Sequence, residues 1–294
     1  IISDLTKIPS HHQSISTLDN WLKDENIPAI SEIDTRALTK KIREKGVMLG
    51  KIINSAKDVK VEDPNNRNLV AEVSLKKMRV WIPNYKSEYG VYGIEYKGEK
   101  KNKILNTNGP NIGLLNCGAK ENIKRSLLAR GATVYELPHN YDPFENKLPL
   151  DGLLISNGPG NPKMAKESIK IIEKAINIKL PTFGVCLGNQ LLALAAGGDT
   201  YKLKFGHRAQ NQPTIHKESK RCYITTQNHG FAVSENKLPK GFKRWFYNAN
   251  DNTNEGIIHE KLPFFSVQFH PEAAPGPTDT EFLFDFFLER IKTQ

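Results

Sequence analysis

Around Cys186 the sequence reads Pro181-Thr-Phe-Gly-Val-Cys-Leu-Gly-Asn-Gln190, and a Leu/Ala-rich run that ends in a Gly-Gly pair follows. The apolar residues 182–185 predict a strand buried on both faces, and the Leu/Ala-rich run predicts a helix. Gly184 and Gly188 allow a tight turn between them, with the backbone close to a bound ligand. Such an elbow presents the cysteine at a helix N-terminus, whose free N–H groups favour a thiolate over a thiol.

An isolated cysteine is more often a small residue of the core, so a second pattern has to decide. Near the C-terminus the sequence reads Phe264-Phe-Ser-Val-Gln-Phe-His-Pro-Glu272. The apolar run predicts a strand that ends at the proline, and His270 and Glu272, two positions apart, would project to the same side of an extended chain. A carboxylate beside an imidazole fixes its tautomer and leaves the other nitrogen free to take a proton from a thiol. The two patterns predict a catalytic triad of nucleophile Cys186, base His270 and orienting carboxylate Glu272.

These motifs, together with Ser156-Asn-Gly-Pro-Gly-Asn-Pro162, resemble those of the class I (triad) glutamine amidotransferases. Two further stretches, Asp34-Thr-Arg-Ala-Leu-Thr39 and 63–73, are similar to the N-terminal domain of the small subunit, or glutaminase region, of glutamine-dependent carbamoyl-phosphate synthetase. The resemblance extends over essentially the whole chain, with the motifs in the family's order. It implies an α/β fold whose mostly parallel sheet is flanked by helices and preceded by a smaller α/β domain that lacks its first part.

The pattern of apolar segments leads to the same fold class. Strand-like and helix-like segments alternate, which indicates a parallel sheet covered on both faces. The expected strands are 48–53, 80–82, 111–115, 133–137, 151–155, 221–226, 242–248 and 256–259. The expected helices are 14–23, 34–45, 121–130, 164–177 and 281–292. We divide the chain into a partial N-terminal domain over 1–85, a polar and basic linker over 86–109 and an amidotransferase domain over 110–294.

Composition limits the function classes. With 294 residues, 38% hydrophobic and 25% charged, the chain is a globular protein large enough for two domains, and no stretch approaches the roughly 20 apolar residues that span a bilayer. It begins with Ile1 rather than Met, as a fragment of a longer protein would. The net charge is +10, which could indicate nucleic-acid binding. The lysines are scattered, however, and no basic motif is interleaved with aromatic residues, so we do not expect nucleic-acid binding. Three unpatterned cysteines suit a reducing compartment; Cys117, at the end of the strand 111–115, is expected to be structural, and Cys222, at the start of a strand, is expected in the core. We expect a cytoplasmic location, or a mitochondrial one for an arginine- or urea-type enzyme.

The resemblance also implies the remaining site residues. The N–H groups of Gly158 and Leu187 would form an oxyanion hole, which stabilises a tetrahedral intermediate by several kcal/mol in similar enzymes. The residues that would bind glutamine are Leu187, Gln190, Asn228, Gly230 and Phe231. His229 has no carboxylate two residues away, and it is expected to be structural or to hold in place residues that contact the substrate.

One position departs from the family pattern. Many relatives have His where this chain has Asn189, and the absent first part of the N-terminal domain supplies a serine contact to glutamine in the family. Some urea-cycle relatives have serine in place of the nucleophile and depend on free ammonia. Because Cys186, His270 and Glu272 are all present, the sequence predicts a competent glutaminase.

The resemblance implies hydrolysis of glutamine to glutamate and ammonia through a cysteine thioester. It implies no metal or cofactor in this chain, and a carbamoyl-phosphate synthetase large subunit or fused synthetase domains as the partner that uses ATP, Mg and bicarbonate. The alternatives are an amidotransferase for another acceptor, a γ-glutamyl peptidase, and a non-catalytic scaffold or regulatory module. Between pyrimidine and arginine or urea synthesis, a multifunctional pyrimidine-pathway protein is our first expectation.

Overall fold

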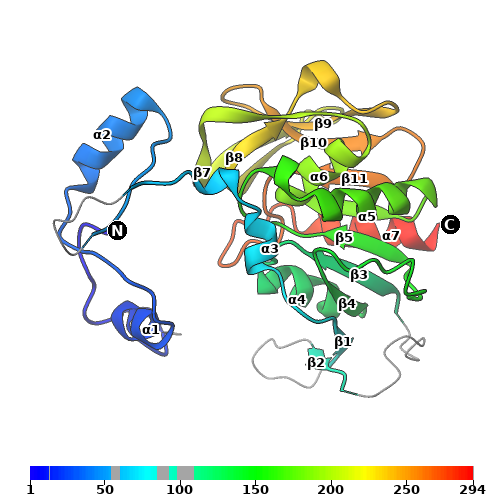
Figure 1. The fold of residues 1–294 in the computed structure, drawn as a ribbon, viewed down its shortest axis with the longest axis horizontal. Coiled ribbons are helices and arrows are strands. Elements are labelled where there is room, and N and C mark those ends of the chain that lie inside the picture. Colours follow the sequence, from blue (N-terminus) through cyan, green and yellow to red (C-terminus); the bar gives the residue numbers. More distant parts are fainter. Residues whose placement is uncertain (13, 54–59, 85–92, 98–108, 294) are drawn as a thin grey trace. The chain divides into compact units, whose positions relative to one another are not determined.

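The computed structural model describes residues 1–12, 14–53, 60–84, 93–97 and 109–293 (Figure 1). The chain forms two compact units, Ile1–Val61 and Glu62–Gln294. The predicted linker, residues 86–109, lies outside the described residues except for 93–97 and 109, so the predicted domain boundaries stay a prediction.

The first unit contains helices α1 (Leu18–Asp24) and α2 (Thr35–Lys45). Helix α2 begins after Asp34, whose carboxylate accepts a hydrogen bond from the Ala37 N–H at 2.8 Å, and it ends at Gly46 with a φ of 88°. Both ends follow the capping residues in the sequence. The strand expected over 48–53 is wrong, because these residues have no regular secondary structure.

The second unit is built on one 11-stranded sheet in the described part of the chain, with the order β2-β1-β4-β3-β5-β6-β11-β10-β9-β7-β8 (Figure 1). The strands are β1 (Arg79–Pro83), β2 (Gly93–Glu95), β3 (Asn111–Asn116), β4 (Thr133–Pro138), β5 (Gly152–Ile155), β6 (Thr182–Val185), β7 (Thr200–His216), β8 (Cys222–Val233), β9 (Phe242–Asn248), β10 (Asn254–His259) and β11 (Phe264–Val267). Parallel pairing joins β4, β3, β5, β6 and β11, and the strands on either side are antiparallel. The α/β class is confirmed, with a mixed sheet whose parallel part is its centre.

Helices cover both faces of the parallel centre. Helices α4 (Glu121–Ala129) and α7 (Phe282–Lys292) pack in one hydrophobic cluster, and α3 (Leu69–Val73), α5 (Lys166–Asn177) and α6 (Leu187–Ala195) pack in another. Within β5, Leu154 joins the first cluster while Leu153 and Ile155 join the second, as the two-residue period of a strand requires. Each fully buried Leu, Ile or Phe side chain contributes about 1.5–3 kcal/mol. Short 3₁₀ turns lie at Pro64–Asn66, Pro162–Met164 and Glu235–Lys237.

Two features of the fold differ from expectation. Strand β7 was not predicted; it contains Gly206 and Pro213, only two of its residues are buried, and its register against β8 shifts twice, so it shows no regular alternation of apolar residues. Cys222 does begin a strand, but its side chain is exposed rather than in the core, because it starts a strand at the edge of the sheet.

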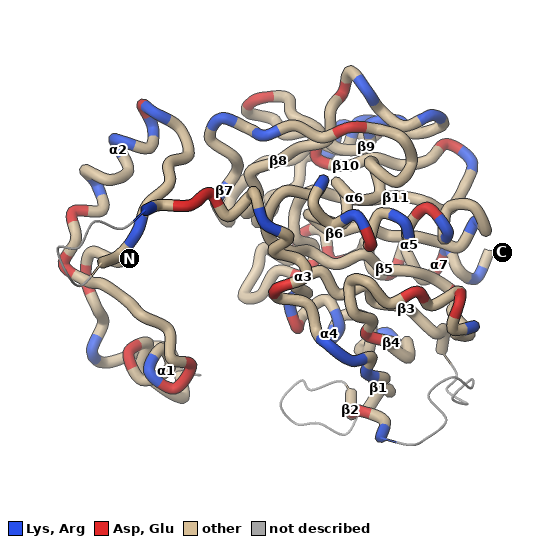
Figure 2. The backbone as a smooth tube through the Cα atoms, in the orientation of Figure 1, with Lys and Arg blue, Asp and Glu red and all other residues tan. Residues whose placement is uncertain are grey.

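Figure 2 shows Lys and Arg interspersed with Asp and Glu along both units, in agreement with the scattered lysines of the sequence. Among the described residues, no helix has the length and apolar character needed to cross a membrane.

Candidate active site

Cys186 lies at the elbow between β6 and α6. Its N–H donates to the Val267 carbonyl of the neighbouring strand β11 at 2.8 Å, and its own carbonyl accepts the Asn189 N–H of helix α6 at 3.1 Å. The backbone has φ 56° and ψ −100°. A non-glycine residue adopts such a conformation at a cost of order 1–3 kcal/mol, so the surrounding structure has to hold it. The side chain is 4% exposed.

Two glycines make this elbow possible. A Cβ at Gly184 would lie 2.4 Å from the carbonyl oxygen of Gly188, and a Cβ at Gly188 would lie 2.2 Å from the carbonyl oxygen of Ile155. Both obstacles are backbone atoms, which cannot rotate away. The tight turn predicted from the two glycines is confirmed.

His270 and Glu272 follow β11 and form the second half of the site. The strand ends at Val267, and residues 270–272 form a turn rather than the expected extended segment. The turn nevertheless joins the two side chains: His270 Nδ1 lies 2.7 Å from Glu272 Oε1, and both residues are buried. The His270 N–H donates to the Thr226 carbonyl of β8 at 3.0 Å, which fixes the base against a second strand.

The charges of this pair depend on their neighbours. Burial alone would lower the pKa of His270, but charge and hydrogen bonding from Cys186 and Glu272 raise it to about 10. Burial would raise the pKa of Glu272, but His270 and Lys120, whose Nζ is 3.6 Å from Glu272 Oε1, lower it. At neutral pH the imidazole is therefore a cation between two groups that favour its positive charge.

The predicted oxyanion-hole residues lie at the same edge of the sheet. Gly158, Cys186 and His270 follow β5, β6 and β11, three adjacent parallel strands, and groups at the carboxyl ends of such strands collect around ligands. A Cβ at Gly158 would lie 2.7 Å from Leu187 Cδ2, so these two residues are in contact. The Leu187 N–H is the first of helix α6 and has no acceptor within the helix. The arrangement can offer two N–H groups to an oxyanion, a role that stays a prediction.

The residues predicted to bind glutamine belong to α6 and β8. Gln190 Nε2 donates to the Phe231 carbonyl at 2.9 Å, so the structure brings these two together. Asn228 is exposed and shares its side of β8 with Gly230. Their strand contacts the triad, because the His270 N–H donates to the Thr226 carbonyl of β8, but no described hydrogen bond joins Asn228 or Gly230 themselves to a triad residue.

A buried amide network behind the nucleophile was missed in the sequence. Gln268 Nε2 donates to Cys186 Sγ at 3.7 Å, and Gln268 Oε1 accepts from Asn189 at 3.2 Å and from Gln190 at 3.1 Å. Ser266 in turn donates to Asn189 Oδ1 at 2.8 Å. Asn189, the departure from the family pattern, is thus part of the group that orients Gln268. No local signal in the sequence indicated this network, because Asn189 and Gln268 lie 79 positions apart.

Two other candidate residues, Cys117 and His229, are not members of the triad. Cys117 is buried beside Ser168, and burial raises the pKa of its thiol to about 12, which suits the expected structural role. His229 is buried on β8, where burial and the neighbouring His207 lower its pKa to about 3, so the ring is neutral. Its expected supporting role stays a prediction.

Comparison with known proteins gives two family matches. Residues 113–290 match the family model described as glutamine amidotransferase class-I, and residues 1–52 match the carbamoyl-phosphate synthase small chain, CPSase domain. The chain is 46% identical over 294 residues to the multifunctional protein CAD of Squalus acanthias, and 45% identical over 294 residues to human mitochondrial carbamoyl-phosphate synthase [ammonia]. These alignments cover 98% and 99% of this chain, but only 12% and 18% of the two relatives.

The fold has counterparts among solved structures. A Thermoplasma acidophilum protein described as a GMP synthase subunit aligns with a TM-score of 0.56 and 22% identity, over 63% of this chain and 95% of that one. At that identity the likeness concerns the fold alone.

Proposed function

We propose a glutaminase function for this chain, which belongs to the class I glutamine amidotransferase family and carries a carbamoyl-phosphate synthase small-chain segment at its start. The observation that carries the proposal is the buried group of Cys186, His270 and Glu272 at the ends of adjacent parallel strands. Cysteine, imidazole and carboxylate are the nucleophile, the base and the orienting group of an acyl-transfer reaction through a covalent intermediate.

The reaction follows from these positions. The Cys186 sulfur attacks the side-chain amide carbon of glutamine, and the charge that develops on the amide oxygen is stabilised by the N–H groups of Gly158 and Leu187. The His270 imidazolium gives its proton to the departing ammonia, which leaves a thioester on Cys186. Water then attacks the thioester while His270 takes a proton from it, and glutamate leaves with the thiolate restored. These steps use protein groups alone.

We propose further that the ammonia passes to an ATP-dependent synthetase for carbamoyl phosphate formation. The match of residues 1–52 and the names of the relatives support this, and this chain corresponds to 12–18% of the length of the relatives compared above. ATP, Mg and bicarbonate would be used by the synthetase, as a large subunit or as fused domains. We favour a pyrimidine-pathway protein in the cytoplasm, with a mitochondrial arginine or urea enzyme as the alternative.

The test is release of glutamate from glutamine by the chain and by Cys186→Ser, with and without a synthetase partner. We expect Cys186→Ser to reduce turnover by roughly 10³-fold or more, because the hydroxyl is a far weaker nucleophile. Cys222→Ser is the matched control, since this thiol is exposed and lies outside the triad. Equal turnover in the Cys186 variant would refute the triad, and no turnover by the unaltered chain even with the partner would favour a non-catalytic scaffold.

A further inference from the structure

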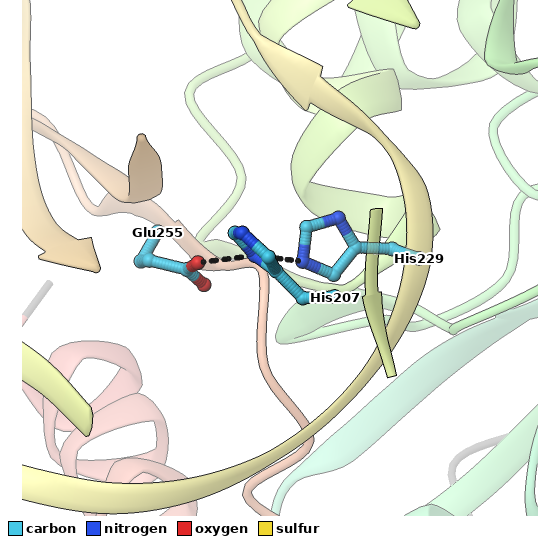
Figure 3. A group of neighbouring side chains, drawn as sticks. All are labelled: His207, His229 and Glu255. Carbon is cyan, nitrogen blue, oxygen red and sulfur yellow. Dashed lines mark hydrogen bonds and ion pairs between the residues drawn. The ribbon is translucent and has the colours of Figure 1, made fainter. Parts of the chain in front are cut away.

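A second polar cluster lies on the antiparallel side of the sheet. His207 of β7, His229 of β8 and Glu255 of β10 have ligand atoms within 4.8 Å of one another. Figure 3 shows the His207 ring between the Glu255 carboxylate and the His229 ring. His207 Nδ1 is 3.2 Å from His229 Nε2 and 3.2 Å from Glu255 Oε1. Gly206 makes the approach possible, because a Cβ there would lie 2.4 Å from the His229 carbonyl oxygen.

The hydrogen-bond partners fix the tautomer of His229. Its Nδ1 lies 2.8 Å from the Phe231 carbonyl, which can only accept, so Nδ1 carries the hydrogen. The neutral ring then presents the lone pair of Nε2 to the cluster. In the same way His207 Nε2 donates to Asp251 Oδ2 at 2.8 Å, and its Nδ1 faces inward.

A fourth acceptor, Gln227 Oε1, points at the same place, 3.1 Å from His229 Nε2. The orientation of this amide follows from its neighbours. The Thr225 hydroxyl donates to the Gln212 carbonyl at 2.8 Å, so its oxygen has to accept from Gln227 Nε2 at 3.1 Å. That leaves Gln227 Oε1 on the side of His229, where an acceptor faces a lone pair and no hydrogen lies between them.

The cluster therefore concentrates acceptors in a buried place. Glu255 is fully buried, and its Oε2 has no hydrogen-bond partner among the described residues. Buried acceptors normally have a donor, because an unpaired one costs roughly 1–3 kcal/mol. A single hydrogen on His207 Nδ1 can be directed at one or two of these atoms, whereas a cation beside them could be bound by several at once.

We propose that His207, His229, Glu255 and Gln227 form a binding site for one divalent metal ion of the zinc class, which ties β7, β8 and β10 together. Zinc ligands lie about 2.0–2.2 Å from the ion, so neighbouring ligand atoms of a tetrahedron are about 3.3–3.5 Å apart. The three successive separations here, 3.1, 3.2 and 3.2 Å, are close to that edge. Two imidazoles with oxygen ligands suit zinc, whereas Mg²⁺ and Ca²⁺ prefer oxygen alone.

The surroundings of the cluster match those of a metal site. Ligating histidines usually donate their second ring N–H to a carboxylate or a backbone carbonyl, and ligating carboxylates are themselves hydrogen-bonded. Asp251 and the Phe231 carbonyl occupy these positions for the two histidines, and Asn248 Nδ2 donates to Glu255 Oε1 at 3.3 Å. No spacing in the sequence indicated this site, because its residues come from three strands.

The test is a calorimetric titration of Zn²⁺ into the full chain carrying Cys186→Ser and Cys222→Ser, so that neither thiol competes for the metal. We expect one ion per chain, no comparable binding of Mg²⁺, and at least tenfold weaker Zn²⁺ binding in His207→Gln and in Glu255→Gln. His216→Gln is the matched control, because this histidine also lies on β7 but bonds to Ser219 outside the cluster. Zn²⁺ binding that is undiminished in both cluster variants, or absent altogether, would overturn the proposal and leave a histidine held by ion pairs alone.

A second measurement leaves the cluster unaltered, in case its variants fail to fold. Nitrogen-15 spectra of the histidine rings should show the signals of His207 Nδ1 and His229 Nε2 shifting on addition of Zn²⁺. If these two signals stay in place while the metal binds, the metal is elsewhere and the proposal is wrong.

Discussion

His270 keeps its proton at neutral pH although burial by itself would remove it. Cys186 and Glu272 raise its pKa to about 10, so the imidazolium is present below that pH and is lost as the pH rises through it. In the proposed reaction the imidazolium supplies the proton for ammonia. The acid should therefore be lost on the alkaline side of the pH profile.

This leads to a prediction for Glu272→Gln, which keeps the shape of the side chain but removes its charge. Without the carboxylate the pKa of His270 should fall, so the alkaline decline of kcat/KM for glutamine should move to lower pH by about one unit or more. The pH dependence of kcat/KM reports on groups of the free enzyme, and comparison with the unaltered chain cancels the titration of glutamine itself. Glu281→Gln, which removes a carboxylate that contacts Arg130 instead, is the control. An unchanged alkaline limb in Glu272→Gln would contradict the assignment.

Site residues were predictable where the residues that act together are close in the sequence. The elbow at Cys186 and the contact of His270 with Glu272 could be derived because the cysteine lies between two glycines and His270 is two residues from Glu272, while the catalytic role of the three residues stays a prediction. The amide network could not, since Asn189 meets Gln268 only across the fold, 79 positions along the chain. For the same reason the His207 cluster has no local pattern.

At the level of elements, the β6–α6 elbow depends on backbone contacts that no side chain can replace. Gly184→Ala would place a Cβ 2.4 Å from the Gly188 carbonyl oxygen, so the strand and the helix would have to separate. We expect a loss of about 3 kcal/mol in the free energy of unfolding, the upper end for overpacked sites.

The matched control is Gly197→Ala at the other end of the same helix. A Cβ there meets nothing within 4 Å, but φ is +89°, so only backbone strain of about 1–2 kcal/mol is expected. Urea unfolding of both variants makes the comparison. If the two lose the same stability, close packing at the elbow does not decide the effect of the substitution.

Helices and strands were predictable where a short stretch of sequence shows a regular apolar pattern or a capping residue. Strand β9 begins and ends as predicted, and the cap of α2 at Asp34 was read from the sequence. Strand β7 was not predictable, because its Gly and Pro argue against a strand and its pairing comes from β8 and β9, which lie later in the chain. The strand expected over 48–53 was wrong, because a strand also needs a neighbouring strand to pair with, and an apolar run in the sequence does not show whether there is one.

At the scale of the whole molecule, the hydrophobic clusters belong to the second unit. The three described clusters contain no residue before Val70, whereas helices α1 and α2 contain no buried residue. Because burial of apolar surface is the main stabilising contribution, the stability of the second unit should not depend on the first.

We therefore expect a shortened chain of residues 62–294 to fold, with a thermal midpoint within a few degrees of that of the full chain, as measured by circular dichroism. Residues 1–52 match the carbamoyl-phosphate synthase small chain, CPSase domain. If the first unit serves to dock the proposed synthetase, the shortened chain should hydrolyse glutamine at a basal rate close to that of the full chain but gain nothing from the partner. The control is the full-length chain with Trp21→Ala, which changes the sequence of the first unit but does not remove the unit.

Aggregation or a much lower midpoint of the shortened chain would show that the second unit needs the first for its stability. Partner stimulation that survives the deletion would instead place the docking surface on the amidotransferase unit.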